Sequence, residues 1–153
     1  MYNYELLKEI GSYNVPVLLK RGFSALISEW VKAADYIIKA GNEKVVLCER
    51  GIRSFENTMR NTLDLATVAY LKKNFDFPVI VDPSHGTGQP DIIPAMSKAA
   101  IAAGADGIIV EVHPHPSEAL SDGFQALTFE GFKALMDQIQ PFLQITNRSL
   151  THG

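Results

Sequence analysis

Several features that mark particular classes of protein are scarce or missing in this sequence. Cys48 is the single cysteine, so no disulfide can form within the chain and no zinc site with several cysteines can be built. No hydrophobic run is long enough to cross a bilayer, and residues 1–5 lack the basic and then apolar order of a secretory signal. We therefore expect a cytoplasmic protein with no membrane partner, in which Cys48 is a small buried hydrophobic residue.

A strong excess of charge of one sign is also missing. The 14 basic and 17 acidic side chains give a formal net charge of −3, and no run of Lys or Arg occurs. This balance argues against a nucleic-acid partner, although it is compatible with a local anion pocket. Low-complexity segments and linkers are absent too, so we expect a single domain over residues 1–145 and a frayed polar tail over residues 146–153.

Four nearly continuous apolar runs have the length and the flanking residues of buried parallel strands. They are residues 16–20, 44–49, 78–82 and 107–112. Helical patterns lie before, between and after them, at residues 4–10, 25–40, 61–73, 92–103 and 128–143. Helices and strands that alternate in this way build either a doubly wound sheet or a (β/α)₈ barrel.

The ends of the predicted strands favour the barrel, because all four carry charged side chains. The charged groups are Lys20 with Arg21, Glu49 with Arg50, Asp82 with His85, and Glu111 with His113. An open sheet binds ligands mainly at one switch point, whereas a barrel directs every strand end to one mouth. A full barrel takes about 200 residues or more. The sequence therefore predicts an α/β fold of parallel βα units that form half of a TIM (β/α)₈ barrel, with four strands and about five helices.

One imidazole and two carboxylates are expected at this mouth. His85 follows the third strand, Glu111 lies in the fourth, and Asp122 lies in the loop after it. Such a nitrogen and oxygen ligand set suits a divalent Mn, Fe, Co or Zn ion. In the alternative interpretation His85 caps a turn and Asp122 is the Asx residue of a Ser-Asp-Gly turn. His113 and His115 are rival ligands, but the proline after each favours a loop role for at least one of them.

Cationic side chains form a second group. Lys20 and Arg50 are expected at the same mouth, where unpaired positive charge implies an anionic ligand with phosphate and carboxylate groups. Alternatively these cations pair internally, for example Lys20 with Glu49. Arg53 and Arg21 are further candidates for the same anion. A metal beside bound phosphates would suit carbon–carbon bond formation or isomerisation of sugar phosphates, because the ion polarises a carbonyl group.

Several long motifs occur together in a fixed order. They are PVLLKRG at 16–22, LCERGIRSFE at 47–56, RNTLDL at 60–65, VDPSHGTG at 81–88, AAGADGIIVEVHPHP at 102–116 and ALSDG at 119–123. Together they make the chain resemble the C-terminal half of 3-deoxy-D-arabino-heptulosonate 7-phosphate (DAHP) synthase. The resemblance implies a metal-dependent barrel enzyme, a transferase of aldolase type that condenses phosphoenolpyruvate with erythrose 4-phosphate. This reaction opens the shikimate pathway of aromatic amino acid biosynthesis.

The resemblance also implies roles for individual residues. The implied metal ligands are His85, Glu111 and Asp122, the substrate-binding residues are Lys20, Arg50 and Arg53, and the catalytic residues are Lys20 and His85. The sister enzyme, 3-deoxy-D-manno-octulosonate 8-phosphate synthase, shares the barrel and the ALSDG-type motif, but RGIRSFENTMRNTLDL at residues 50–65 favours DAHP synthase. A hypothesis of a different class is a half barrel that assembles without catalysing a reaction.

The sequence also departs from the family pattern. Family members carry a further metal ligand, a cysteine, and the substrate-binding segments Lys-Pro-Arg-Thr-Ser and Gly-Ala-Arg-Asn, none of which occurs here in its family position. We therefore expect this chain alone to bind metal weakly and to have little or no synthase activity. Because a half barrel leaves two open strand edges and an apolar face, we also expect a homo-oligomer, most simply a dimer.

Overall fold

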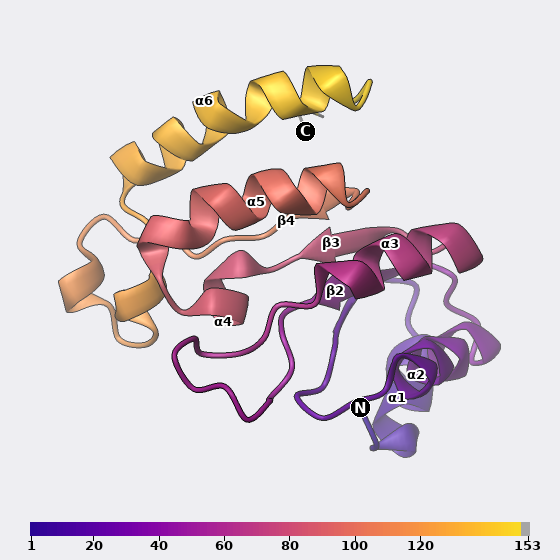
Figure 1. Cartoon of the computed structure of the whole chain (residues 1–153). Coiled ribbons are helices and arrows are strands. Elements are labelled where there is room, and N and C mark those ends of the chain that lie inside the picture. The colour runs from indigo at the N-terminus through magenta and orange to yellow at the C-terminus, as the bar shows by residue number, and fades with distance from the viewer. Residues whose placement is uncertain (151–153) are drawn as a thin grey trace.

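A computed structural model describes residues 1–150 as strands that alternate with helices. The strands are β1 (Val17–Lys20), β2 (Val45–Glu49), β3 (Val79–Val81) and β4 (Gly107–Ile108). The α-helices are α1 (Tyr4–Gly11), α2 (Ile27–Lys39), α3 (Leu65–Asn74), α4 (Pro83–Thr87), α5 (Ile93–Ala102) and α6 (Phe129–Ile145). Single 3₁₀ turns are η1 (Pro90–Ile92), η2 (Pro116–Glu118) and η3 (Gly123–Gln125). Figure 1 shows α5 and α6 packed side by side.

The four strands form one parallel sheet in the order β1-β2-β3-β4. Strands that follow the chain order without reversal are typical of a barrel wall, whereas a doubly wound sheet reverses its order at a switch point. The four predicted strands are therefore confirmed, with their neighbours in barrel order.

Two boundaries differ from the prediction for identifiable reasons. The expected helix at 61–73 begins only at Leu65, because the side chain of Asp64 caps it by accepting a hydrogen bond from the Thr67 backbone amide (3.0 Å). The expected strand at 107–112 ends at Ile108. Its partner β3 turns into α4 immediately after Asp82, so beyond the Ile109 bond to Val81 the segment has no neighbouring strand on that side.

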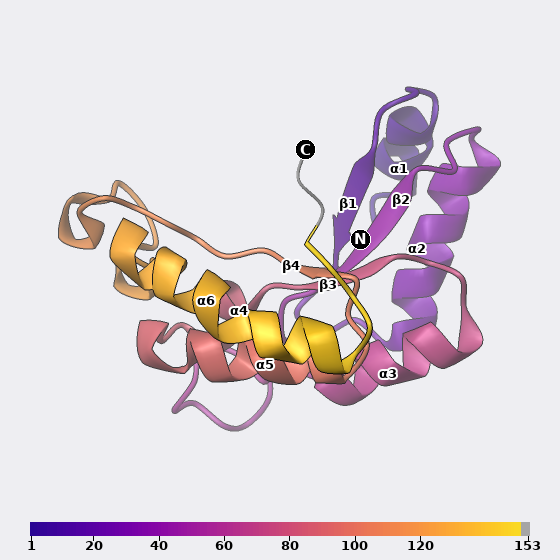
Figure 2. The same cartoon turned by 90° about the horizontal axis from the view of Figure 1, so that it is seen from above.

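The two faces of the sheet have different surroundings. Val17, Leu19, Leu47 and Val79 pack with the helices in the main core, around the fully buried Trp30. Side chains of the opposite face lie outside this core, and Leu18 is 40% exposed. Figure 2 shows the helices of residues 1–150 along the outer side of the curved sheet and none of them on its inner side. This one-sided arrangement is what a segment of a barrel wall requires.

Cys48 lies in β2 and is fully buried as a free thiol, as predicted. Burial raises the pKa of this thiol to about 12, and the nearby charge of Asp82 acts in the same direction. At the C-terminal end, Arg148 donates hydrogen bonds to the carbonyls of Gly104 (3.0 Å) and Ala105. The prediction of a frayed tail falls in part on residues 151–153, which lie outside the described residues. Within residues 1–150, no helix combines the length and the apolar character that a membrane span needs.

Candidate metal and anion site

His85 is positioned by a short helix at the end of β3. Asp82 caps this helix, α4, by accepting a hydrogen bond from the His85 backbone amide (3.0 Å), and Pro83 occupies the first helical turn. The sequence suggested only a glycine-rich turn here, although Asp followed by Pro is a helix-start signal. Gly88 ends α4 with φ +69°. A Cβ at this position would lie 2.7 Å from the Cβ of Arg60, so the glycine leaves room for the Arg60 side chain.

Three potential metal ligands come together above the strand ends. His85, Glu111 and Asp122 each offer a donor atom, and these atoms all lie within 4.8 Å of one another. His85 Nε2 is 3.2 Å from Glu111 Oε1 and 3.7 Å from Asp122 Oδ2. Asp122 adopts φ +53°, a left-handed conformation that is uncommon for residues other than glycine. Gly123 follows it, and a Cβ there would lie 2.0 Å from the Pro116 carbonyl oxygen.

The second ring nitrogen of His85 faces a buried carboxylate. His85 Nδ1 lies 2.8 Å from Asp82 Oδ2, although this contact is not aligned as a regular hydrogen bond. Metal-ligating histidines commonly turn one nitrogen to a carboxylate and the other to the metal. The donor set and this arrangement fit a divalent ion held at Nε2. Asp82 was not among the predicted site residues, and its helix-capping pattern was the signal that could have found it.

The cations meet different partners at the ends of β1 and β2. Lys20 Nζ forms an ion pair with Asp82 Oδ2 (2.9 Å), so Asp82 connects Lys20 to His85. Arg50 instead lies over the ring of Phe23, with Cζ 4.3 Å from the ring centroid. Arg50 Nε is buried without a hydrogen-bond partner among residues 1–150. Arg53 Cζ is 6.0 Å from the centroid of the same ring, so two guanidinium groups lie near one aromatic side chain.

Arg21, a further candidate for the anion, is instead committed to a buried ion-pair network. Its guanidinium donates to Glu49 (2.9 Å), Asp64 (3.2 Å) and Thr67 (3.3 Å), and it is 5% exposed. Glu49 therefore pairs with Arg21, and the alternative pair of Lys20 with Glu49 does not form. Burial raises the pKa of Glu49 although Arg21 opposes it. Burial also acts to raise the pKa of Asp64, but hydrogen bonds from Thr67 and Arg21 lower it overall.

Two residues that the sequence did not single out contact the ligand group. Arg60 donates to Asp122 Oδ1 (2.9 Å) and to Gln125 Oε1, and Gln125 Nε2 donates to Glu111 Oε2 (2.7 Å). The rival ligands His113 and His115 are outside the group, and the His115 backbone amide donates to His113 Nδ1 (3.0 Å). Only the RNTLDL motif pointed at Arg60, and no local pattern marked Gln125.

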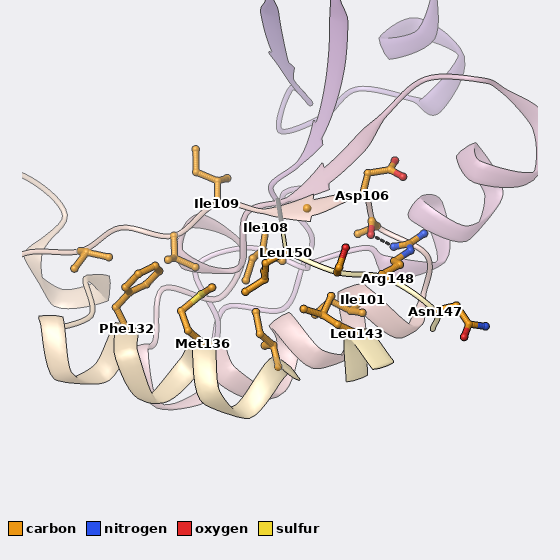
Figure 3. Close-up of a pocket in the computed structure, with 16 residues that line it drawn as sticks. Ile101, Asp106, Ile108, Ile109, Phe132, Met136, Leu143, Asn147, Arg148 and Leu150 are labelled. Carbon is orange, nitrogen blue, oxygen red and sulfur yellow. Dashed lines mark hydrogen bonds between the residues drawn. The ribbon is translucent and has the colours of Figure 1, made fainter. Parts of the chain in front are cut away.

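A groove lies away from these ligands. It has a volume of about 800 Å³ and runs between β4 and α6 (Figure 3). Phe132 and Met136 of α6 and Ile108 of β4 line it, and none of the three candidate ligands does. Its apolar lining lies beside β4, whose outer edge has no partner strand within residues 1–150.

Comparison with known proteins identifies the family. A family model described as the DAHP synthetase I family matches residues 1–145. The chain belongs to this family. Its similarity to the phospho-2-dehydro-3-deoxyheptonate aldolase of Thermotoga maritima is 54% identity over 138 residues, which are 90% of this chain and 41% of that protein. The 2-dehydro-3-deoxyphosphooctonate aldolase of Dichelobacter nodosus is 31% identical over 149 residues, which are 89% of this chain and 52% of that protein.

Solved structures agree with this assignment. The crystal structure of the Thermotoga maritima DAHP synthase superimposes with a TM-score of 0.96 and 50% identity, over 98% of this chain and 44% of that one. A truncated form of the same enzyme gives a TM-score of 0.95 and 50% identity, over 98% and 57% of the two chains. The prediction of half of a (β/α)₈ barrel of the DAHP synthase type is thus confirmed. The chain spans about two-fifths of the length of its Thermotoga relative.

Proposed function

We propose that this chain supplies the metal-binding and phosphoenolpyruvate-binding part of a DAHP synthase barrel, which condenses phosphoenolpyruvate with erythrose 4-phosphate. The observation that carries the proposal is the convergence of His85, Glu111 and Asp122 within 4.8 Å at the strand ends that also bear Lys20 and Arg50. Because both substrates are intracellular sugar or enol phosphates, the proposal places the chain in the cytoplasm.

Each residue has a distinct task in this proposal. His85 Nε2, Glu111 Oε1 and Asp122 Oδ2 would hold a divalent Mn, Fe, Co or Zn ion. When bound, such an ion supplies a Lewis acid that polarises a carbonyl group. Arg50 offers paired N–H donors to a phosphate or carboxylate group, and Arg53 adds positive charge beside it. Lys20, held by Asp82, provides a point charge and a proton at Nζ close to His85.

DAHP synthase is favoured over the octulosonate sister enzyme by the similarity itself. The identity is 54% to the heptonate aldolase and 31% to the octonate aldolase, over nearly the same share of this chain. The experiment that tests this choice mixes the chain with the part of the Thermotoga protein that it does not match. Phosphate release with erythrose 4-phosphate and not with arabinose 5-phosphate supports the proposal, and the reverse preference contradicts it.

Ligand binding tests the site without depending on turnover. Calorimetric titration of the chain with phosphoenolpyruvate is expected to show binding that Arg50→Met weakens. Binding that is unchanged in Arg50→Met would contradict the proposed site.

We further propose a homo-oligomer, most simply a dimer in which two half barrels complete one ring. Both outer strands, β1 and β4, have an open edge within residues 1–150, and both run in the same direction. A second copy can therefore place its β1 beside β4, next to the apolar groove lined by Phe132 and Met136. Light scattering at micromolar concentration is expected to show a dimer or larger species. A well-folded monomer under these conditions would contradict the oligomer.

A further inference from the structure

A buried amide connects the two carboxylates of the ligand group. Gln125 is fully buried at the end of η3. Its Nε2 donates to Glu111 Oε2 at 2.7 Å, while its Oε1 accepts from Arg60 Nη1. The same Arg60 nitrogen donates to Asp122 Oδ1 at 2.9 Å. The four residues thus form one continuous chain of hydrogen bonds from Glu111 to Asp122.

The chemistry of the partners leaves the amide only one orientation. The Arg60 guanidinium has donors and no acceptor, so it requires the Gln125 oxygen. The ionised Glu111 carboxylate has acceptors and no donor, so it requires the Gln125 nitrogen. A rotation of the amide by half a turn would break both bonds and leave a buried polar group without a partner, which is costly.

The two oxygens of each carboxylate therefore have different partners. Glu111 Oε2 and Asp122 Oδ1 accept from the Gln125 and Arg60 side chains, whereas Glu111 Oε1 and Asp122 Oδ2 face His85 Nε2. One oxygen of each carboxylate remains directed at the same point. The Arg60 charge also offsets part of the repulsion between the two acids.

The fold holds Arg60 firmly against the helix that carries His85. The Arg60 backbone amide donates to the Thr87 carbonyl (3.0 Å), and the next residue, Asn61, donates from its backbone to Gly86 (3.0 Å). The Asn61 side-chain amide donates to the His85 carbonyl (2.8 Å). The loop between β2 and α3 is thus tied to α4, and Arg60 extends from it to the Asp122 loop.

We propose that Gln125 and Arg60 are positioning residues for the metal centre, and that together they present one oxygen of Glu111 and one of Asp122 to the ion. This inference rests on the metal centre proposed above. Outer contacts of this kind typically change metal affinity by about 10–100-fold when they are removed. The ion that is affected is a divalent transition metal bound by the chain itself.

The test is a titration of the full chain with Co²⁺, followed by the visible absorption of the bound ion. Gln125→Met keeps the length of the side chain and removes both hydrogen bonds, so affinity is expected to fall by about 10–100-fold and the absorption bands to change in shape. Gln144→Met makes the same substitution at an exposed position of α6 and is expected to behave as wild type. Circular dichroism and thermal unfolding show that each variant is folded.

Arg60→Met provides a second variant in case Gln125→Met does not fold, because the Arg60 side chain is only partly buried, at 30% exposure. It is expected to weaken Co²⁺ binding and to alter the same bands. The double variant is expected to lose less than the product of the two single losses, because both remove one hydrogen-bonded unit. Arg60→Lys is expected to recover part of the affinity by restoring the charge.

The outcomes separate the two proposals. Wild type that binds Co²⁺ through His85, with unchanged affinity and spectrum in Gln125→Met and Arg60→Met, would overturn the positioning role alone. A lower affinity with an unchanged spectrum and strictly multiplicative losses would also overturn it. Wild type that binds no Co²⁺ at millimolar concentration would overturn the metal centre and, with it, the positioning role.

Discussion

The two sides of the strand-end rim satisfy their charges in different ways. On the side of β3 and β4, Asp122 accepts from Arg60 and Glu111 accepts from Gln125, which itself bonds to Arg60, so the acids are fixed by the protein itself. On the side of β1 and β2, Arg50 lies against the Phe23 ring, and its Nε has no acceptor among residues 1–150. One side holds negative charge in a rigid arrangement, and the other holds positive charge against an aromatic surface.

This difference indicates what each side is prepared to receive. Two carboxylates with one guanidinium, which pairs with Asp122, keep an excess of negative charge for a cation. A guanidinium that rests on a ring, without a carboxylate partner among residues 1–150, keeps its donors for an anion. Lys20 and Asp82 lie between the two sides as an ion pair, and Asp82 also faces His85. Three predictions below test this division and a fourth tests the burial of Cys48 beneath it, from the largest expected effect to the smallest.

Replacement of His85 by Ala is expected to have the largest effect, on the acidic side. Because the imidazole is a proposed direct ligand, Mn²⁺ affinity is expected to fall by more than about 100-fold, beyond the range of outer contacts. Calorimetry or electron paramagnetic resonance measures this change. His113→Ala is the matched control, because His113 lies outside the ligand group. Equal losses in both variants, or none in either, would show that the metal is held elsewhere.

On the cationic side, Arg50→Met is expected to weaken phosphoenolpyruvate binding by about 10–100-fold, because a hydrogen bond to a charged group contributes about 1.5–3 kcal/mol. Metal affinity should stay unchanged if the two sides are independent. Titration calorimetry with each ligand separates the effects. Lys44→Met removes an exposed cation just before β2, at the opposite end of the strand, and serves as the control. A parallel loss of Mn²⁺ affinity in Arg50→Met would contradict the division of the rim.

Phe23→Leu tests whether the aromatic surface matters for the same anion. Cation–π contacts at exposed sites contribute about 0.5–1 kcal/mol, so affinity for phosphoenolpyruvate is expected to fall about two- to fivefold. Phe55→Leu, at a fully exposed ring in the neighbouring loop, should leave it unchanged. If Phe23→Leu binds as wild type does, the ring is only a neighbour of Arg50 and not its support.

Cys48 lies in β2, paired in register with Lys20, and yields the smallest effect. Its folded pKa is about 12 against an ordinary value of 9.0, so between these values the unfolded chain releases a proton that the folded chain keeps. Stability from this thiol is therefore complete well below pH 9 and is lost as the pH rises through 9. From pH 7.5 to 9.0, the stability advantage of wild type over Cys48→Ala should shrink by about 0.4 kcal/mol in urea unfolding. Parallel pH profiles for the two proteins would contradict this.

Much of the fold was predictable from local patterns. Apolar runs placed all four strands, and charged strand ends favoured a barrel wall over a doubly wound sheet. Helix boundaries were less predictable where a side chain accepts a hydrogen bond from a backbone amide, as Asp64 and Asp82 do when they cap α3 and α4. β4 was expected to be longer, because nothing in its own residues shows that β3 ends at Val81.

The candidate site was likewise predictable only in part. The sequence by itself determined the strands and pointed to the candidate ligands His85, Glu111 and Asp122 and to the cations Lys20 and Arg50, because each follows from local periodicity or from a motif. Only the tertiary structure decided that Arg21 is buried with Glu49, that Arg50 rests on Phe23, and that Arg60 and Gln125 join the two acids. These contacts connect residues far apart in the chain, and their partners are selected by packing and by the need of every buried polar group for a hydrogen bond.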